Sequence, residues 1–431
     1  MKNIKFISAV LLAMSLFACK KQYTNPNAAT NVEVFANPDA LARVIVGIKL
    51  RWAVGSSPVY HSISATALST KEAVVLNAGN ADLSTLDRGG SDLAPNNGVI
   101  TGLWSTTNLV GAEAQKVIDG SNSIGDVNLR NSVKSYGHLY KALALGTLAT
   151  FWEKVPLKNE TNAVFSTRVE ALQAAVKLLD DASVLMNSTT IPASFTTAVG
   201  NDIDLPNALK AIAARYYIML GDNTNALARA ASVDLTKKSA YFYNTTNLNP
   251  VFRLSLTSNN VYGIRLQFGL SGSLAPAAAD LRIPYHLTKN GANGSGFFLS
   301  DVTPLPLYQP GEMLLIQAEA LARTNQLPQA KTALDLVLTK TTDAFGLGAG
   351  LPVYSGPVTQ VDLLNEIYRN RCIELYLSGL KLEDSRRFGR LAPPLNTNPL
   401  PATVERSRNF YPYPQQERDG NPTNTPADPA I

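Results

Sequence analysis

Residues 308–339 read YQPGEMLLIQAEALARTNQLPQAKTALDLVLT. Apolar residues recur at i, i+1, i+4, i+7 and i+8 in the first half and at i, i+3, i+4, i+7 and i+8 in the second, so each half predicts a helix with one apolar stripe. Asn325 tolerates the left-handed conformation that ends a helix, and Pro328 suits the first turn of the next helix. Because one such hairpin cannot bury its own stripe, it needs stacked neighbours.

Two further helix pairs are predicted N-terminal to this hairpin. Residues 129–151 carry one apolar stripe, and the capping box of Thr167 and Glu170 opens a partner helix. Residues 209–231 form another pair around a Gly-Asp-Asn turn. The pairs have roughly tetratricopeptide size but share no strict sequence period. They predict a mainly α protein with an irregular tetratricopeptide-like helical repeat scaffold.

The segments around these pairs differ in composition. Single helices are expected near 37–52 and 62–76, from Trp104 to Ile118 and from Thr359 to Leu377, with a polar loop over 77–99. Residues 232–307 are rich in Gly, Ser, Asn, Tyr and Phe, which predicts a loop-rich lobe with a few short strands. The Pro-rich tail 392–431 shows no helical period. We therefore expect a single domain over 37–431, with the scaffold at about 37–231 and 308–389.

The N-terminus reads as an export signal. Lys2 and Lys5 precede an apolar run that ends at Phe17, which is too short to span a bilayer and is typical of a signal peptide over residues 1–18. Leu16-Phe17-Ala18-Cys19 also resembles a bacterial lipobox, so Cys19 is the predicted lipidation site and 19–36 a tether. The alternative is an ordinary signal peptide that ends near a cysteine. With two cysteines in the chain, a disulfide framework is excluded.

Charge and motif content exclude several classes. Loss of the two signal-peptide lysines lowers the formal net charge from +5 to +3, which is too mild for a nucleic-acid partner. The chain has no phosphate-binding fingerprint. Its three histidines are far apart, and the aspartates of the 77–99 loop lack EF-hand spacing. We expect no cofactor and no metal.

Charged residues crowd the region 371–387. Arg371, Glu374, Asp384, Arg386 and Arg387 could suggest catalysis, but a structural ion-pair network that pins helix to tail explains them better. Arg371 and Glu374 stand three apart and can pair on one helical face. A hydrolase would need two carboxylates at a set separation across an open cleft, which this spacing does not require. We expect no catalytic residue and no enzymatic activity.

Binding is the remaining function, and loop tyrosines are the candidates. A glycan site needs flat aromatic platforms with polar groups at the rim, in loops held by a rigid frame. Packing of the lobe onto the scaffold is the alternative role for any single tyrosine, whereas Trp52 and Trp104 are expected in the core. The predicted ligand-binding residues are Tyr60, Tyr241, Tyr243, Tyr262 and Tyr285.

Several stretches together resemble the SusD/RagB family of outer-membrane lipoproteins of the Bacteroidetes, which bind nutrients for uptake. Residues 371–379 (RCIELYLSG) and 384–389 (DSRRFG) are similar to its signature helix and the Arg-Arg-aromatic-Gly run behind it. Three other stretches also resemble family motifs and stand in the family's order along the chain. They are the post-lipobox YTNPN at 23–27, the link WEKVPL at 152–157 and the tail FYPYP at 410–414. The resemblance covers nearly the whole chain.

The resemblance implies a structural signature, a location and a partner. Arg371, Glu374, Gly379, Asp384, Arg386, Arg387 and Gly389 match the signature. The implied protein is lipid-anchored at the outer membrane, on the cell surface, and captures oligosaccharide with a TonB-dependent SusC-like transporter. Two departures stand out: Asn370 and Ser378 replace frequent glutamates, and Lys20-Lys21-Gln22 lacks the acidic pair that resembles a surface-export signal.

Two alternatives remain on the same architecture. One is capture of peptide or another nutrient, for which fewer coplanar aromatics and a charged groove are expected. The other is a tetratricopeptide assembly scaffold without a small ligand, which would lack a concave aromatic pocket.

Overall fold

The computed structural model describes residues 38–252, 262–287, 295–390 and 405–430. The predicted signal peptide, Cys19 and the tether lie outside these residues. Helices dominate these residues, and the strands among them form three two-stranded antiparallel sheets: β1 (Ala73–Val75) with β5 (Tyr262–Ile264), β2 (Lys154–Pro156) with β3 (Phe165–Thr167), and β4 (Ala240–Tyr241) with β6 (Leu305–Pro306). The predicted mainly α fold with a few short strands is confirmed.

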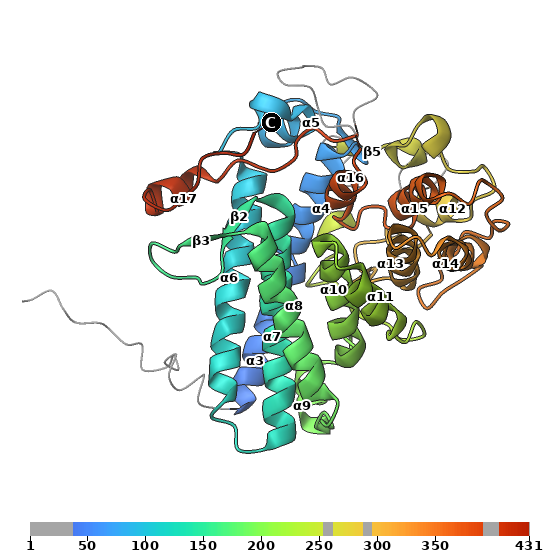
Figure 1. The fold of residues 1–431 in the computed structure, drawn as a ribbon. Helices are drawn as coiled ribbons and strands as arrows, with labels where there is room; N and C mark the ends of the chain where they lie inside the picture. Colours follow the sequence, from blue (N-terminus) through green and yellow to red (C-terminus); the bar gives the residue numbers. More distant parts are fainter. Residues whose placement is uncertain (1–37, 253–261, 288–294, 391–404, 431) are drawn as a thin grey trace, which may run out of the picture.

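The N-terminal half is a bundle of long helices (Figure 1). Its members are α3 (Pro38–Ala53), α6 (Gly98–Ser121), α7 (Val127–Phe151) and α8 (Arg168–Met186), with the short α9 (Ala193–Val199) against α3. The central α7 packs between α6 and α8. The predicted capping box is present: Thr167 accepts from the Glu170 N–H, and the Glu170 carboxylate accepts from the Thr167 N–H.

The row of helices continues through the C-terminal half. The hairpin of α10 (Leu205–Leu220) and α11 (Asn223–Ala231) packs on α8 through α10 and on α13 (Pro310–Arg323) through α11, and α14 (Leu327–Thr339) and α15 (Gln360–Glu374) complete the row. Asn325, in the turn of the 308–339 hairpin, has a φ of +58° as expected. The three predicted helix pairs therefore share one scaffold.

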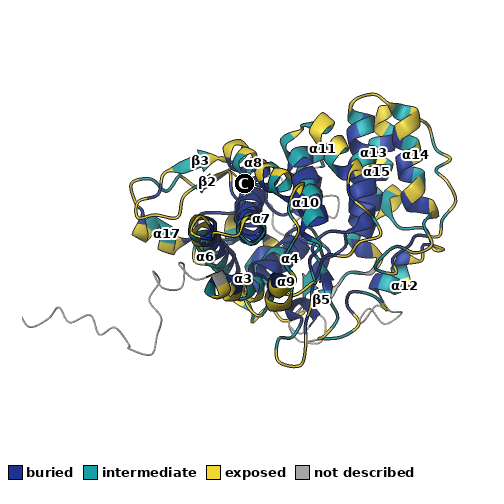
Figure 2. Ribbon diagram, turned by 90° about the horizontal axis from the view of Figure 1, so that it is seen from below, coloured by how far each residue is buried: buried dark blue, intermediate teal, exposed yellow. Residues whose placement is uncertain are grey.

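Alanine and glycine let the helix backbones approach closely. In α7, a Cβ built on Gly146 would lie 2.0 Å from the ring of Tyr216 on α10. One large core runs from α3 to the C-terminal tail, and a second small core lies among α13, α14 and α15. Exposed residues gather on the outer sides of α11 and α14 (Figure 2). Among the described helices, none is long and apolar enough to cross a membrane.

Three local predictions between residues 58 and 121 were wrong. The helix expected at 62–76 is α4 (Pro58–Ser69), which begins at the Ser57 cap, and the β-branched Val74 and Val75 belong to β1 instead. The polar loop 77–99 contains α5 (Ala81–Arg88). The third helix, α6, begins at Gly98 rather than Trp104, because Asn97 accepts hydrogen bonds from the N–H groups of Val99 and Ile100.

The C-terminal region also departs from expectation. A short helix α16 (Lys381–Arg387) follows α15, and the tail predicted to lack helix contains α17 (Gln415–Gly420). Glu417 in the first turn of α17 accepts from the Trp104 indole N–H at 3.0 Å, and this contact fixes the helix on α6. The tail returns to the N-terminal bundle, where Tyr411 stacks on Phe151.

Candidate functional site

The signature residues form a buried network of ion pairs. Arg371 donates through Nε to Asp384 at 2.9 Å, and Arg387 donates to the other Asp384 oxygen at 2.8 Å. Burial alone would raise the pKa of Asp384, but Arg371 and Arg387 outweigh burial and lower it. The same Arg387 contacts Glu319 on α13, so α13, α15 and α16 are held together.

Glu374 has other partners than the one expected from sequence spacing. Its Oε2 accepts from Arg282 at 3.2 Å, and its Oε1 accepts from Lys340. Arg282, from the short α12 (Arg282–His286), is fully buried and also bonds Asp280 and Asn370. The predicted pairing of Arg371 with Glu374 is therefore wrong, since the two side chains point to different neighbours.

A third group of ion pairs joins the bundle to α16. Glu383 contacts both Arg168 at the start of α8 and Arg386. Arg386 also donates to the backbone oxygens of Thr150 and Asn409. Because each of these carboxylates is buried and held by a guanidinium, the network stabilises the fold and does not present paired carboxylates to an open cleft. Gly379 and Gly389 adopt positive φ, +82° and +60°, next to these helices.

The predicted ligand tyrosines do not lie together. Tyr241 and Tyr243 are buried against the end of α3, where Tyr241 accepts from the Trp52 indole N–H at 2.8 Å and Tyr243 donates to the Ala53 carbonyl at 3.2 Å. Tyr60 is half-buried against the ring of His61.

The other two predicted tyrosines are Tyr285 and Tyr262. Tyr285 is half-buried, donates to the Phe345 carbonyl at 2.9 Å and packs edge to face on Phe297. The backbone of Tyr262 pairs with Val75 in the β1–β5 sheet, and its side chain lies outside the described part. Trp52 and Trp104 are buried, as expected.

The histidines do not suggest a metal centre. His61, His138 and His286 are all buried, and burial lowers the pKa of the first two to about 4 and that of His286 to about 3. Among the described residues, no three His, Cys, Asp or Glu side chains gather into a possible metal site. Cys372 is buried, and burial raises the pKa of its thiol to about 12.

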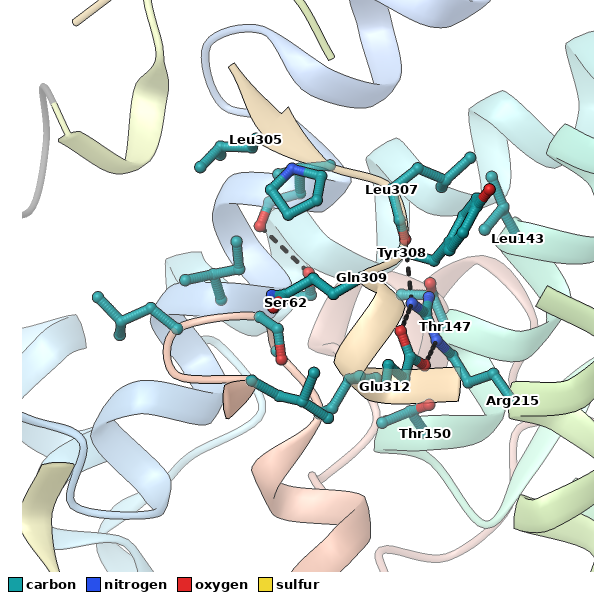
Figure 3. A pocket seen from close by; sticks show the side chains of 18 of the residues that line it. Ser62, Leu143, Thr147, Thr150, Arg215, Leu305, Leu307, Tyr308, Gln309 and Glu312 are labelled. Carbon is teal, nitrogen blue, oxygen red and sulfur yellow. Dashed lines mark hydrogen bonds and ion pairs between the residues drawn. The ribbon is translucent and has the colours of Figure 1, made fainter. Parts of the chain in front are cut away.

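A cavity of about 100 Å³ lies between α4, α7, α10 and α13 (Figure 3). On its wall the guanidinium of Arg215 donates to both Glu312 oxygens, at 2.6 and 2.7 Å, and to the Leu307 carbonyl. The Gln309 side-chain oxygen is buried without a partner among the described residues. The cavity could hold about three waters at about 30 Å³ each and is smaller than the pockets that bind drug-sized ligands.

A second hollow, of about 240 Å³, opens where the lobe meets both parts of the scaffold. We call it the junction pocket. The Gly/Ser-rich loop 269–274 forms one wall, and the charged residues Lys71, Lys381, Arg390 and Glu405 line the remainder with Thr70. It contains no aromatic lining residue among those described.

Backbone strain collects beside the junction pocket. Lys71, Gln267, Phe268 and Leu377 have φ values between +52° and +62°, a region that residues other than glycine rarely adopt. The buried carboxyl of Glu72 lies among them and accepts from the Leu377 N–H at 3.3 Å. Such strain tends to cluster at ligand clamps and switch regions.

Two further hollows, each of about 480 Å³, lie on the scaffold. One is lined by the α10–α11 turn with Arg323 and Arg387, both of which already hold Glu319. The other lies among α7, α9 and α10 with Lys237 and Lys238 at its edge. The junction pocket differs from these two hollows because strained residues stand next to it: Lys71 lines it, and Gln267 and Phe268 directly precede its loop wall.

Sequence reasoning missed the junction pocket. The run GLSGSL at 269–274 was visible as loop composition, but Lys71 and Lys381 lie hundreds of positions apart, and no spacing rule connects them. Arg282 and Arg215, which hold signature and cavity carboxylates, were also missed because their partners come from distant helices.

Solved structures of SusD superfamily proteins share this fold over nearly the whole chain. One from Bacteroides vulgatus has 15% sequence identity and a TM-score of 0.70, covering 91% of this chain and 99% of its own. A SusD-like carbohydrate binding protein from the same organism has 15% identity and a TM-score of 0.69, covering 92% and 98%. A SusD/RagB family protein from Bacteroides thetaiotaomicron has 17% identity and a TM-score of 0.63, covering 92% and 95%.

No protein-family model and no curated protein sequence matches the chain. The protein nevertheless has the SusD fold, since these structures cover most of both chains. The resemblance to SusD/RagB proteins that the sequence motifs predicted is confirmed at the level of fold.

Proposed function

We propose that this protein is a non-enzymatic cell-envelope lipoprotein that captures oligosaccharide for uptake by a TonB-dependent SusC-like transporter. The observation that carries the proposal is the SusD fold over about nine-tenths of the chain, shared with a structure described as a SusD-like carbohydrate binding protein and another described as a putative sugar binding protein. The signature carboxylates support a binding role rather than hydrolysis, because ion pairs occupy them.

Ligand contact is proposed for the tyrosines with exposed ring surface, which lie in the helices α4 and α12 and not in loops as the sequence predicted. Tyr60 and Tyr285 are half-buried, so part of each ring remains available for stacking on the apolar face of a sugar. Tyr241 and Tyr243 use their hydroxyls within the core, and Tyr241 lines the cavity of about 100 Å³ together with Trp52. Tyr262 completes the proposed set.

Isothermal titration of the mature chain against a panel of neutral and acidic oligosaccharides and of peptides tests the proposal. We expect binding to at least one oligosaccharide, weakened in Tyr60→Ala or Tyr285→Ala and unchanged in Tyr354→Ala, a tyrosine further along the α14–α15 loop, whose hydroxyl bonds Pro357, that serves as the matched control. Binding to peptides but to no oligosaccharide would overturn the proposed cargo. Turnover of any glycan would overturn the non-enzymatic assignment.

The lipid anchor and the envelope location need their own test. In a bacterial host the full chain should incorporate labelled fatty acid and sediment with membranes, and Cys19→Ser should do neither. Equal labelling of both chains would refute lipidation at Cys19. Co-purification with a transporter expressed from the same cells tests the partner.

Capture of peptide or another nutrient is the second candidate. The observation that favours it is that the predicted tyrosines form no common aromatic platform: Tyr241 contacts Trp52, Tyr60 lies against His61, and Tyr285 bonds Phe345. The titration panel separates the two cargo classes directly.

A further inference from the structure

We propose that the junction pocket binds a carboxylate or sulfate group of the cargo, which makes the cargo an acidic oligosaccharide. The inference rests on the proposed function, because it names the chemical class of the saccharide. It does not depend on any of the predicted tyrosines.

A buried cation on the pocket wall is the first argument. The side chain of Lys381 is 4% exposed, and its ammonium donates to the Phe268 carbonyl at 3.2 Å. Among the described residues, no carboxylate lies within ion-pair distance of it. Removing an ammonium from water without a counter-charge in contact is costly, so an anion from outside would find a site that already favours it.

The nearest carboxyl groups do not cancel this charge. Glu405 is engaged by Arg390 at 2.7 Å and accepts from the Tyr368 hydroxyl at 2.6 Å. Glu72 lies behind the wall, and burial raises its pKa to about 7, so near neutral pH it carries only part of a charge. Lys71 at the rim adds a second cation to the lining.

The loop wall supplies neutral donors. The N–H groups of Leu270 and Leu274 are used inside the loop, bonding the carbonyls of Gln267 and Ser271. Those of Ser271, Gly272 and Ser273 have no partner in the described parts of the chain. Successive backbone N–H groups in a turn of this kind suit an oxyanion.

Size and openness fit a pendant group on a longer chain. At about 240 Å³ the hollow admits one charged sugar unit, and it opens to solvent beside exposed Ser271, Gly272 and Ser273. The remainder of an oligosaccharide would continue across the lobe. A neutral sugar would leave the Lys381 ammonium without a counter-charge, so the pocket selects for the acidic group.

The test titrates the mature chain with an oligogalacturonate, its methyl ester and a neutral malto-oligosaccharide of equal length. We expect the free acid to bind at least about tenfold more tightly than the ester, because the ester loses one charge-assisted contact. Binding of the acid should weaken as salt is added. A sulfated oligosaccharide and its desulfated form distinguish sulfate from carboxylate.

Variants assign the effect to this pocket. Lys381→Met keeps the length of the side chain and removes the charge, and Ser273→Asp places a carboxylate on the exposed loop without disturbing a buried group. Both should lose the preference for the acid, whereas Lys177→Met, a solvent-exposed lysine on α8, should keep it. Thermal unfolding of each variant identifies any that fails to fold, and Ser273→Asp remains informative if Lys381→Met does.

The outcomes separate the two proposals. Equal affinity within both pairs, the acid with its ester and the sulfated with the desulfated oligosaccharide, overturns the anion site and leaves oligosaccharide capture standing. A preference for the charged form that survives both pocket variants does the same. Binding of no saccharide of any charge overturns both.

Discussion

The charge of Glu374 should be worth about 3 kcal/mol of folding free energy. Its side chain is fully buried, and its two oxygens hold Arg282 and Lys340. Glu374→Gln preserves the volume, so no cavity term arises, but both cations lose one carboxylate in the interior. Breaking a buried pair costs about 3–5 kcal/mol, and the lower end applies because Arg282 keeps Asp280 and Lys340 keeps Asp343.

Urea unfolding of the variant and of the wild type measures the difference. The midpoint should fall with little change in slope, since the change alters stability and not the exposed area. The matched control is Asp181→Asn, the same loss of one negative charge. That residue pairs with Lys177 on the exposed side of α8 at 2.7 Å, and such a surface pair is worth at most about 0.5 kcal/mol.

The pH dependence gives a second test of the same reasoning. Burial alone would raise the pKa of Glu374, but Lys340 and Arg282 outweigh burial and lower it in the folded state. A lowered folded pKa stabilises the protein above the unfolded pKa, and that stability is lost as pH falls through the folded value. The gap between wild type and Glu374→Gln should therefore narrow in acid. The reasoning would be refuted if Glu374→Gln lowered the free energy of unfolding by less than about 1 kcal/mol at neutral pH, or if the difference from wild type did not change in acid.

The remaining predictions concern three other buried positions. Burial raises the pKa of Glu72 to about 7, so the folded state binds the extra proton and stability should fall as pH rises from 4.5 through 7, a loss that Glu72→Gln should abolish in unfolding midpoints measured across that range. Gly146→Ala should destabilise by about 1–3 kcal/mol because its Cβ would overlap the Tyr216 ring, and adding Tyr216→Leu should restore part of the loss in a double-variant cycle. Both ring nitrogens of His286 are buried without a partner among the described residues, inside an aromatic cluster with Phe297 and Tyr376. His286→Phe should therefore raise the free energy of unfolding by about 1 kcal/mol, measured from the unfolding midpoint. A clear destabilisation would show that the imidazole has a hydrogen-bond partner.

The scaffold could be predicted from sequence because the apolar stripe, the cap and the turn residue of each helix lie within a short stretch of the chain. The 308–339 hairpin carries its stripe, its Asn turn and its Pro start in consecutive residues, and α13 and α14 form there. The Thr167–Glu170 capping box is equally local. The errors lie where a short apolar pattern fits both a helix and a strand. Val74 and Val75 continued the apolar pattern of the preceding helix, but they pair with β5, almost 190 residues later in the chain.

The candidate site was less predictable for the same physical reason. The charge crowd at 371–387 correctly suggested an ion-pair network, yet Arg371 and Glu374 each bind a partner that spacing along one helix could not reveal. A tyrosine in the sequence can either pack in the core or contact a ligand, and its residue type does not tell which. Tyr241 packs in the core, where its hydroxyl accepts a hydrogen bond from the Trp52 indole. The junction pocket exists only after tertiary folding brings loop 269–274 to Lys381.

The return of the tail to the first helices has a consequence for how the chain matures. Tyr411 stacks on Phe151, the Trp152 indole donates to the Pro412 carbonyl, and the Ser407 N–H bonds the Ser69 carbonyl. A ribosome releases the α3–α8 bundle long before these residues emerge. The aromatic end of the bundle therefore stays exposed to solvent until roughly the last thirty residues have been synthesised and pack on it. A nonsense mutation near the end of the gene would leave the α3–α8 bundle incompletely packed.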